Sequence, residues 1–386
     1  MRIGIVSETY PPEINGVALT VHSLATGLAA RGHSIDLIRP RQPQPHVDEP
    51  GIETMTTRGA ALPRYPGLRF GLPAGRALRK HWTQQRPDAI YVATEGPLGW
   101  SALRAAGHLQ IPMATGFHTR FDSYAAHYGV GWLTPVVRRH LRRFHSRAAA
   151  TLVPTTALAE ELNSLGVNNA RLLRRAVDTQ LFHPRMRDLS LREQWGVEAD
   201  TPVVLYVGRI APEKNLELAV EAFKSIQQHI PTARYVWVGD GPARAALQAA
   251  HPDFIFTGVK RGEALAQHYA SADLFPFPSL SETFGNVILE ALAAGLPVVA
   301  YDEGAAREHL HDGINGYRIA SGNAPAFIKA TTTLACNPGL IRHMGRAAHE
   351  GIAQLSPDAV IREFETLLRE LAEEHLHERD VAIAGA

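Results

Sequence analysis

The sequence predicts an α/β protein made of two doubly wound, Rossmann-like domains. Apolar runs with the length of strands alternate with helical patterns along the 386 residues, which is typical of parallel sheets with crossover helices. This alternation occurs in two series of similar length, and a chain of this size can form two separate hydrophobic cores. The two series also differ in charge, because residues 1–180 hold 21 Lys and Arg against 12 Asp and Glu, whereas residues 181–386 hold 18 against 26. We therefore expect two domains with different partners.

The first series begins with Arg2–Ser7, which has the pattern of a buried strand. A loop leads from there to Gly16, and apolar residues then recur at helical spacing until Gly32. Residues 40–75 are rich in Pro, Gly and Arg, so we expect loops with short elements there. Further strands of the first sheet are predicted at residues 35–38, 88–92, 113–115, 150–153 and 171–173.

The second series begins with a strand at Val203–Val207. Further strands are predicted at residues 235–238, 254–256, 274–277 and 297–300. Pro184 and several charges interrupt the pattern near residues 174–195, where we place the linker. The predicted division is an N-terminal domain at 1–180, a C-terminal domain at 190–358, and a final helix with a tail at 359–386.

Two carboxylates lie eight residues apart in the stretch Ser281–Glu290. The stretch follows a short apolar run and precedes a helical pattern, so we expect Glu282 in a loop and Glu290 about two turns into a helix. A helix N-terminus offers N–H groups and positive potential to phosphate. A loop carboxylate beside it can accept hydrogen bonds from sugar hydroxyls. This arrangement indicates a ligand that is part phosphate and part polyol.

Two cations lie five residues apart on the loop that follows the first strand of the second series. Arg209 and Lys214 lead there into a helix. Open α/β sheets bind ligands beyond the carboxyl ends of their strands. Two fixed cations at such a place can hold a diphosphate and neutralise the charge that develops on a departing group.

The spacing of Glu282 and Glu290, with Phe284-Gly285 between them, resembles the signature of retaining glycosyltransferases of the GT4 type, which have the GT-B fold. The resemblance covers the chain from Met1 to about residue 370. It implies two domains that face each other across a cleft, with the acceptor bound by the first domain and the nucleotide sugar by the second. It also implies that the final helix returns to the first domain.

The resemblance implies a role for each motif of the second domain. Arg209 and Lys214 bind the nucleotide diphosphate, and Glu290 binds the ribose hydroxyls of the donor. Glu282 holds hydroxyls of the transferred sugar. Backbone N–H groups assist it from Phe284, Gly285 and Asn286.

Three further positions match the family pattern. Gly16 lies in the loop that abuts the donor phosphate in the family, and its lack of a side chain allows close approach of the backbone. The family often has Gly-Gly-Val here, and this chain has Asn15 in place of the first glycine. His118 ends a strand where family members carry a histidine that contacts donor sugar hydroxyls. Val259 lies in the segment that flanks the base, where the contacts are largely made by the backbone.

The segment Leu133–Arg147 has the pattern of a basic amphipathic helix. Its cations include Arg138, Arg139, Arg142 and Arg143. One interpretation is attraction to anionic lipid, worth about 1 kcal/mol per basic residue near the surface, and many family members glycosylate lipids. The alternative is an ordinary solvated face over the core. Nucleic-acid binding is disfavoured because aromatic residues are not interleaved with the cations.

Several classes of site are not expected. The single cysteine, Cys336, rules out a disulfide framework. The chain has no Asp-x-Asp, which argues against the metal-dependent GT-A glycosyltransferases, and no His/Cys spacing for zinc. Gly239-Asp240-Gly241 lacks the third glycine and the acidic partner of a dinucleotide fingerprint. We therefore expect no metal and no cofactor, with Arg209 and Lys214 in the electrostatic role of a metal.

The N-terminus does not resemble a signal peptide, and no run approaches the roughly 20 apolar residues of a membrane helix. The expected location is the cytoplasm, with peripheral binding to the inner face of the cytoplasmic membrane as a further expectation.

Together these features predict a metal-independent, retaining hexosyltransferase that forms an α-linkage on a lipid or glycan hydroxyl. The opening Glu8–Val17 most resembles the GDP-mannose-dependent α-mannosyltransferases, so mannose is the favoured sugar. One alternative is transfer from UDP-glucose to diacylglycerol, which the basic helix fits. Others are a hydrolase or epimerase of the same fold, for which no suitable carboxylate is found, and a non-catalytic nucleotide-sugar-binding protein.

Overall fold

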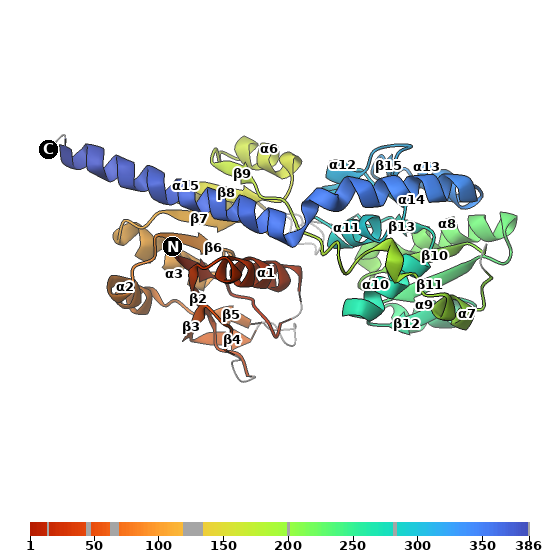
Figure 1. Cartoon of the computed structure of the whole chain (residues 1–386), viewed down its shortest axis with the longest axis horizontal. Helices are drawn as coiled ribbons and strands as arrows, with labels where there is room; N and C mark the ends of the chain where they lie inside the picture. Colours follow the sequence, from red (N-terminus) through yellow and green to blue (C-terminus); the bar gives the residue numbers. More distant parts are fainter. Residues whose placement is uncertain are drawn as a thin grey trace. The chain divides into compact units, whose positions relative to one another are not determined.

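The computed structural model describes residues 1–13, 15–43, 48–61, 69–118, 134–198, 201–280 and 284–384. The chain forms two compact units (Figure 1). Unit 1 comprises Met1–Arg175 together with Pro357–Ala386, and unit 2 comprises Ala176–Ser356. The N-terminal part of unit 1 thus ends at Arg175, before the boundary near residue 180 that the sequence suggested, and the linker residues from Ala176 onward belong to unit 2.

Unit 1 is built on a parallel seven-stranded sheet with the order β3-β2-β1-β6-β7-β8-β9. The strands are β1 (Arg2–Val6), β2 (Ser34–Pro40), β3 (Ile52–Thr57), β6 (Ala89–Val92), β7 (Met113–Gly116), β8 (Ala150–Val153) and β9 (Ala170–Leu172). Strands β1, β2 and β6–β8 are almost entirely buried, as their apolar runs predicted.

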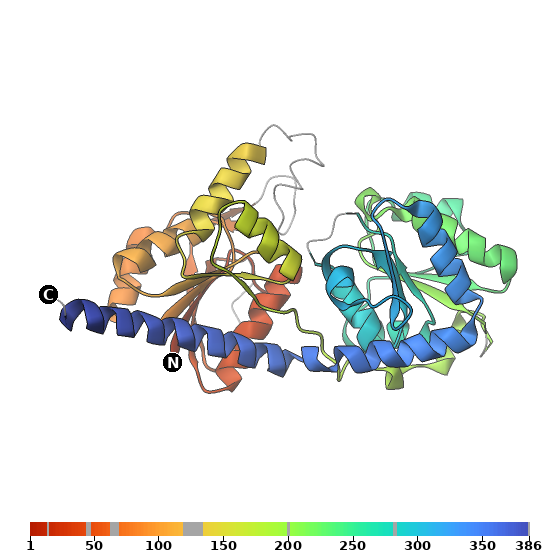
Figure 2. The ribbon, with the colours of Figure 1, turned by 90° about the horizontal axis from the view of Figure 1, so that it is seen from above.

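Helices cover both faces of this sheet (Figure 2). On one face, α1 (Gly16–Ala30) packs against α15 (Pro357–Ala384). The other face is covered by α2 (Gly75–Gln84) and α3 (Pro97–His108), whose apolar side chains share one core with β1 and β6. Two further helices are α5 (Thr134–His145) and α6 (Thr156–Ser164).

The region 40–75 is more regular than its composition predicts. It contains β3 and an antiparallel pair, β4 (Gly59–Ala61) and β5 (Arg69–Gly71). β3 is an edge strand of the main sheet, and it is rich in threonine, with Ile52 and Thr57 buried. An edge strand needs few apolar side chains, so the hydrophobic pattern did not reveal it.

The final helix belongs to unit 1 and is longer than the sequence suggested, because it starts at Pro357 and continues to Ala384. A Cβ atom at Gly27 of α1 would lie 2.1 Å from Ile361 Cδ1, so a glycine is needed where the two helices touch. Glu365 accepts hydrogen bonds from Arg31 at 2.5 Å and from His33 at 3.0 Å, and these contacts lower the pKa of Glu365 to about 2.

Unit 2 contains two parallel three-stranded sheets, β10-β11-β12 and β13-β14-β15. A parallel bridge between Val204 and Leu274 joins them, so β10 and β13 are neighbours. The strands are β10 (Val203–Val207), β11 (Arg234–Val238), β12 (Ile255–Gly258), β13 (Phe275–Phe277), β14 (Val298–Tyr301) and β15 (Gly316–Ile319). The sequence did not indicate β15, whose residues are only partly apolar.

The helices of unit 2 also lie on both faces. α8 (Leu216–His229) packs against α13 (Ala324–Ala335) on one face. α10 (Gly262–Ser271), α11 (Asn286–Ala293) and α14 (Pro338–Ile352) supply core residues on the other. The remaining helices are α7 (Leu189–Gln194), α9 (Arg244–Ala250) and α12 (Gly304–His309).

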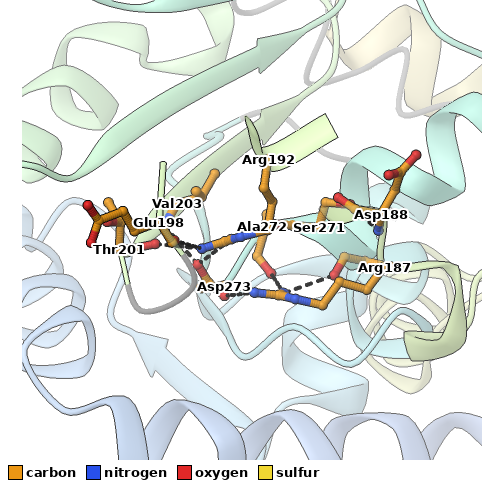
Figure 3. A network of polar contacts seen from close by, with 10 residues as sticks. Arg187, Asp188, Arg192, Glu198, Thr201, Val203, Ser271, Ala272 and Asp273 are labelled. Atoms are coloured by element: carbon orange, nitrogen blue, oxygen red, sulfur yellow. Dashed lines mark hydrogen bonds and ion pairs between the residues drawn. The ribbon is translucent and has the colours of Figure 1, made fainter. Parts of the chain in front are cut away.

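A buried polar network explains why the linker belongs to unit 2 (Figure 3). Arg192 of α7 is 2% exposed, and it donates to Asp273 Oδ2 at 3.0 Å and to the carbonyl of Ser271 at 2.8 Å. Arg187 donates to the other carboxylate oxygen of Asp273 at 2.9 Å. The same carboxylate accepts from the backbone N–H of Val203 at 2.9 Å. One aspartate therefore ties the linker to the start of β10.

Candidate active site

Each unit has one point where the order of its parallel strands reverses, and such points are where open α/β sheets bind ligands. In unit 2 this point lies between β10 and β13. The loop after β10 carries the predicted cations, and the loop after β13 leads into α11. Asn215 Nδ2 donates to the carbonyl of Pro278 at 3.3 Å, so the two loops are in contact. The structure thereby brings together two motifs that lie about 70 residues apart.

Arg209 and Lys214 both lie at the carboxyl end of β10. The side chain of Arg209 is 56% exposed and lies 3.3 Å from Glu213. Lys214 is half-buried in the one-turn 3-10 helix Pro212–Lys214. Asn215 adopts the left-handed conformation, with φ +55°, and ends this turn at the start of α8. An incoming diphosphate would compete with Glu213 for Arg209.

The N-terminus of α11 has the geometry expected of an anion site. Gly285, at φ +91°, precedes the helix and has no side chain to cap it, and the first N–H groups of a helix have no partner within it. Phe284 is buried, and its carbonyl accepts from Ala305 N–H at 2.7 Å, which fixes the turn. Asn286 is the first residue of the helix. Glu282, which we expect to act at the same place, lies outside the described residues.

Glu290 is half-buried in α11. Its Oε2 accepts a hydrogen bond from the Tyr269 hydroxyl of α10 at 2.8 Å. Burial raises the pKa of Glu290, and the tyrosine hydrogen bond opposes that rise. No sequence pattern indicated Tyr269, because its position relative to Glu290 depends on the packing of α10 against α11. Val259, which follows β12, is 59% exposed and available to a ligand.

In unit 1, His118 lies just beyond the carboxyl end of β7 in a cluster of polar groups. Its Nε2 lies 2.7 Å from Tyr91 Oη, and its Nδ1 lies 2.6 Å from Arg175 Nη2. Arg175 also donates to Thr20 Oγ1 at 2.7 Å. Burial lowers the pKa of His118, and the nearby charge of Arg175 lowers it further. Both ring nitrogens are therefore engaged, and the ring is neutral.

Gly16 is connected to the same cluster. It is the first residue of α1, and its carbonyl accepts from Thr20 Oγ1 at 2.8 Å. Asn15, where the family often has glycine, caps this helix through its Oδ1, which accepts from Ala18 N–H at 2.8 Å. The departure from the family pattern therefore has a local structural role.

Two buried carboxylates, which no sequence pattern indicated, lie near the switch point between β1 and β6. Glu8 accepts from Leu98 N–H at 2.9 Å, at the start of α3. Burial raises its pKa to about 7, although hydrogen bonds from the backbone oppose the rise. Glu95 Oε1 lies 3.4 Å from Nε2 of His145, which is fully buried.

The predicted basic helix is present as α5. Leu141 and Phe144 are buried, and Arg138, Arg139, Arg142 and Arg143 are exposed. Val136 is also 63% exposed on this helix.

Among the described residues, no group of three or more His, Cys, Asp or Glu side chains is placed to hold a metal ion. In the same part of the chain, no helix is both long and apolar enough to cross a bilayer.

Two family models match the chain. The model described as Glycosyltransferase Family 4 matches residues 14–181, and the model described as Glycosyl transferases group 1 matches residues 201–337. A GDP-mannose-dependent alpha-mannosyltransferase from Mycolicibacterium smegmatis is 37% identical over 316 residues, which cover 80% of this chain and 81% of the relative. An alpha-monoglucosyldiacylglycerol synthase from Acholeplasma laidlawii is 27% identical, over 97% of this chain and 98% of the relative.

Among solved structures, the chain is similar to sucrose-phosphate synthase from Thermosynechococcus elongatus. The TM-score is 0.76 at 20% identity, over 96% of this chain and 98% of that one. This likeness confirms the fold predicted from the sequence, GT-B with two Rossmann-like domains.

Proposed function

Because the chain belongs to the family 4 glycosyltransferases, we propose that it transfers mannose from GDP-mannose to a hydroxyl of a lipid or glycan, with retention at the anomeric carbon. Its membership makes it a hexosyltransferase. The observation that carries the proposal is the contact between the two loops at the β10–β13 switch point. That contact supports the proposal because it joins the loop that carries Arg209 and Lys214 to the loop that leads into α11, and a nucleotide diphosphate sugar needs both cations and a helix N-terminus.

The proposed mechanism assigns each group of unit 2 to one part of the donor. Arg209 and Lys214 stabilise the negative charge that develops on the diphosphate as its bond to the anomeric carbon breaks. The acceptor oxygen attacks the same face of the sugar, and the departing phosphate oxygen takes the acceptor's proton. Glu290, held by Tyr269, accepts hydrogen bonds from the ribose. This reaction needs no nucleophilic side chain and no metal.

The remaining predicted residues keep their expected roles in this proposal. Glu282 and the backbone of Phe284–Asn286 bind hydroxyls of the transferred sugar, and His118 binds a sugar hydroxyl. Val259 flanks the base, and Gly16 approaches the phosphate. Unit 1 binds the acceptor.

Mannose is favoured because the mannosyltransferase from M. smegmatis is 37% identical, whereas the glucolipid synthase from A. laidlawii is 27% identical. Transfer from UDP-glucose to diacylglycerol remains the second candidate, and α5 supports it through its exposed arginines. A non-catalytic nucleotide-sugar-binding protein is the third, and it would bind a donor without turnover.

The first experiment is isothermal titration calorimetry with GDP-mannose, GDP, UDP-glucose and UDP, in buffer that contains EDTA. We expect the GDP ligands to bind more tightly and the sugar to be transferred to mannosylated lipid or glycan acceptors. Tighter binding of the UDP ligands would select the glucosyl alternative. Absence of binding at millimolar concentration would refute the assignment of the donor site.

The cations are tested by Lys214→Ala, with Lys224→Ala as a matched control, since Lys224 is exposed on α8. Loss of a group that stabilises a leaving group costs about 10²–10³ in rate. We expect that loss for Lys214→Ala, together with weaker binding of GDP, and no change for the control. Unchanged kinetics for Lys214→Ala would remove Lys214 from the site.

We further propose that α5 attracts unit 1 to anionic lipid. Arg142→Glu together with Arg143→Glu should weaken binding to vesicles that contain anionic phospholipid, and salt should weaken binding of the wild type. The matched control is Arg76→Glu with Arg79→Glu, an exposed pair on α2. Equal loss in both double variants would indicate a general charge effect instead of a membrane-facing helix.

A further inference from the structure

Arg175 is a buried arginine outside the motifs that define the family signature. It is 9% exposed and is the last residue of unit 1 before the linker. One nitrogen of its guanidinium lies 2.6 Å from His118 Nδ1, and another lies 2.7 Å from Thr20 Oγ1. Arg175 therefore connects His118, which follows the carboxyl end of β7, to Thr20 in the second turn of α1.

The contact with Arg175 determines the chemistry of the imidazole. A guanidinium only donates hydrogen bonds and stays protonated in proteins. His118 Nδ1 must therefore accept, and the proton of the neutral ring resides on Nε2. That nitrogen lies 2.7 Å from Tyr91 Oη, so Nε2–H points toward the tyrosine oxygen.

The charged and titratable groups around His118 come from three elements. Arg175 faces it from the segment after β9, Tyr91 from β6, and His145 from α5. Glu95 lies 3.4 Å from His145 on the far side. Burial and the two nearby cationic or basic groups all lower the pKa of His118.

The packing leaves little freedom to this arrangement. A Cβ atom at Gly116 would lie 2.2 Å from Tyr91 Oη and 2.5 Å from His118 Nε2, so only glycine leaves room for the pair. The ring of Tyr91 packs edge-on against Phe364 of α15, with centroids 5.0 Å apart. The imidazole is thus held from both of its nitrogens.

We propose that Arg175 is a positioning residue for His118, which it holds as the Nε2–H tautomer and links through Thr20 to the first turns of α1. A sugar hydroxyl at this site then competes with Tyr91 Oη for the hydrogen bond from Nε2–H. The catalytic part of this inference rests on the proposed function, because it uses the contact of His118 with the transferred sugar.

The test compares Arg175→Met and Arg175→Lys with the wild type. The first readout is the pH profile of kcat/KM for the donor. We expect a profile without an acid limb between pH 5.5 and 8 for the wild type, because His118 stays neutral. In Arg175→Met the charge that helps to lower the pKa of His118 is gone, so this pKa should rise, while burial still holds it below the ordinary value. An acid limb should then appear at the low-pH end of this range. Turnover should also fall about 10–100-fold, as when outer partners of a site are removed.

Arg175→Lys separates charge from geometry. Lysine keeps the positive charge, so the profile should stay flat. Its single ammonium cannot reproduce the fork that contacts both His118 and Thr20, so turnover should still fall. Arg174→Met, which removes an exposed arginine one residue earlier, should change neither quantity.

The second readout is independent of activity. Nitrogen-15 spectra of histidine-labelled protein, with His118 assigned by its loss in His118→Gln, report which ring nitrogen carries the proton. We expect Nε2–H in the wild type and in Arg175→Lys, and a mixture of tautomers in Arg175→Met. A pure Nε2–H signal and a flat pH profile in Arg175→Met would overturn the proposal. If Arg175→Met does not fold, wild-type turnover in Arg175→Lys would overturn it.

These outcomes are distinct from failure of the proposed function. A wild-type protein without transferase activity would refute the proposed function, while the spectra would still decide whether Arg175 sets the tautomer of His118.

Discussion

Glu8 provides a direct test of the electrostatics of unit 1. Glu8 is 8% exposed, and its carboxylate accepts a hydrogen bond from Leu98 N–H at 2.9 Å. Burial raises its pKa from the ordinary 4.5 to about 7. Between these two pH values, the unfolded chain releases a proton that the folded chain retains. The free energy of unfolding must therefore fall as the pH rises through this window.

The size of the effect follows from the two pKa values. Each pKa unit corresponds to about 1.4 kcal/mol, so the folded state loses about 3 kcal/mol between pH 4.5 and pH 7 through this group. Glu8→Gln is uncharged at every pH and keeps an oxygen that can accept from Leu98. We expect the free energy of unfolding of the variant to rise by about 3 kcal/mol relative to that of the wild type when the pH is raised from 4.5 to 8.

The measurement is urea unfolding of both proteins across this pH range. The amide costs the same free energy in the pocket at every pH. This cost cancels, because only the pH dependence of the difference in unfolding free energy between variant and wild type is used. Glu160→Gln, on the exposed side of α6, is the matched control and should give a constant difference. A constant difference for Glu8→Gln as well would show that Glu8 ionises normally and would refute the burial argument.

Two further predictions concern packing and buried charge. Asp273→Ala removes the carboxylate that pairs with Arg187 and Arg192. Arg192 would keep its hydrogen bonds to backbone carbonyls, but its buried charge would lose this carboxylate, so we expect unit 2 to lose about 3–5 kcal/mol in urea unfolding. A loss below about 1 kcal/mol would contradict this role. Gly27→Val places atoms where Ile361 of α15 now lies. We expect the free energy of unfolding to fall by about 1–3 kcal/mol from overpacking and the C-terminal helix to be cleaved faster by protease. An unchanged cleavage rate would contradict the contact between the two helices.

The sequence by itself determined the parts of this protein that depend on neighbouring residues. Buried parallel strands require continuous apolar runs, so β1, β6 and β10 were recognisable without the structure. Loops at the carboxyl ends of such strands bind ligands, so Arg209 and Lys214 could be placed in a site from the chain alone. The N-terminus of α11 was also predicted from local pattern, because the first N–H groups of a helix have no partner within it, whereas the role of Gly285 came from the family resemblance.

Only the tertiary structure decided which distant residues meet. Tyr269 pairs with Glu290, and Arg175 with His118, because helices and strands far apart in the sequence are packed together. Hydrophobic periodicity gives the buried face of an element but not its neighbour, so neither pair could be predicted. The pKa of Glu8 is raised for the same reason, since its burial depends on where α3 begins relative to β1. Local pattern therefore indicated the candidate groups of the site, and long-range packing set their partners, protonation and orientation.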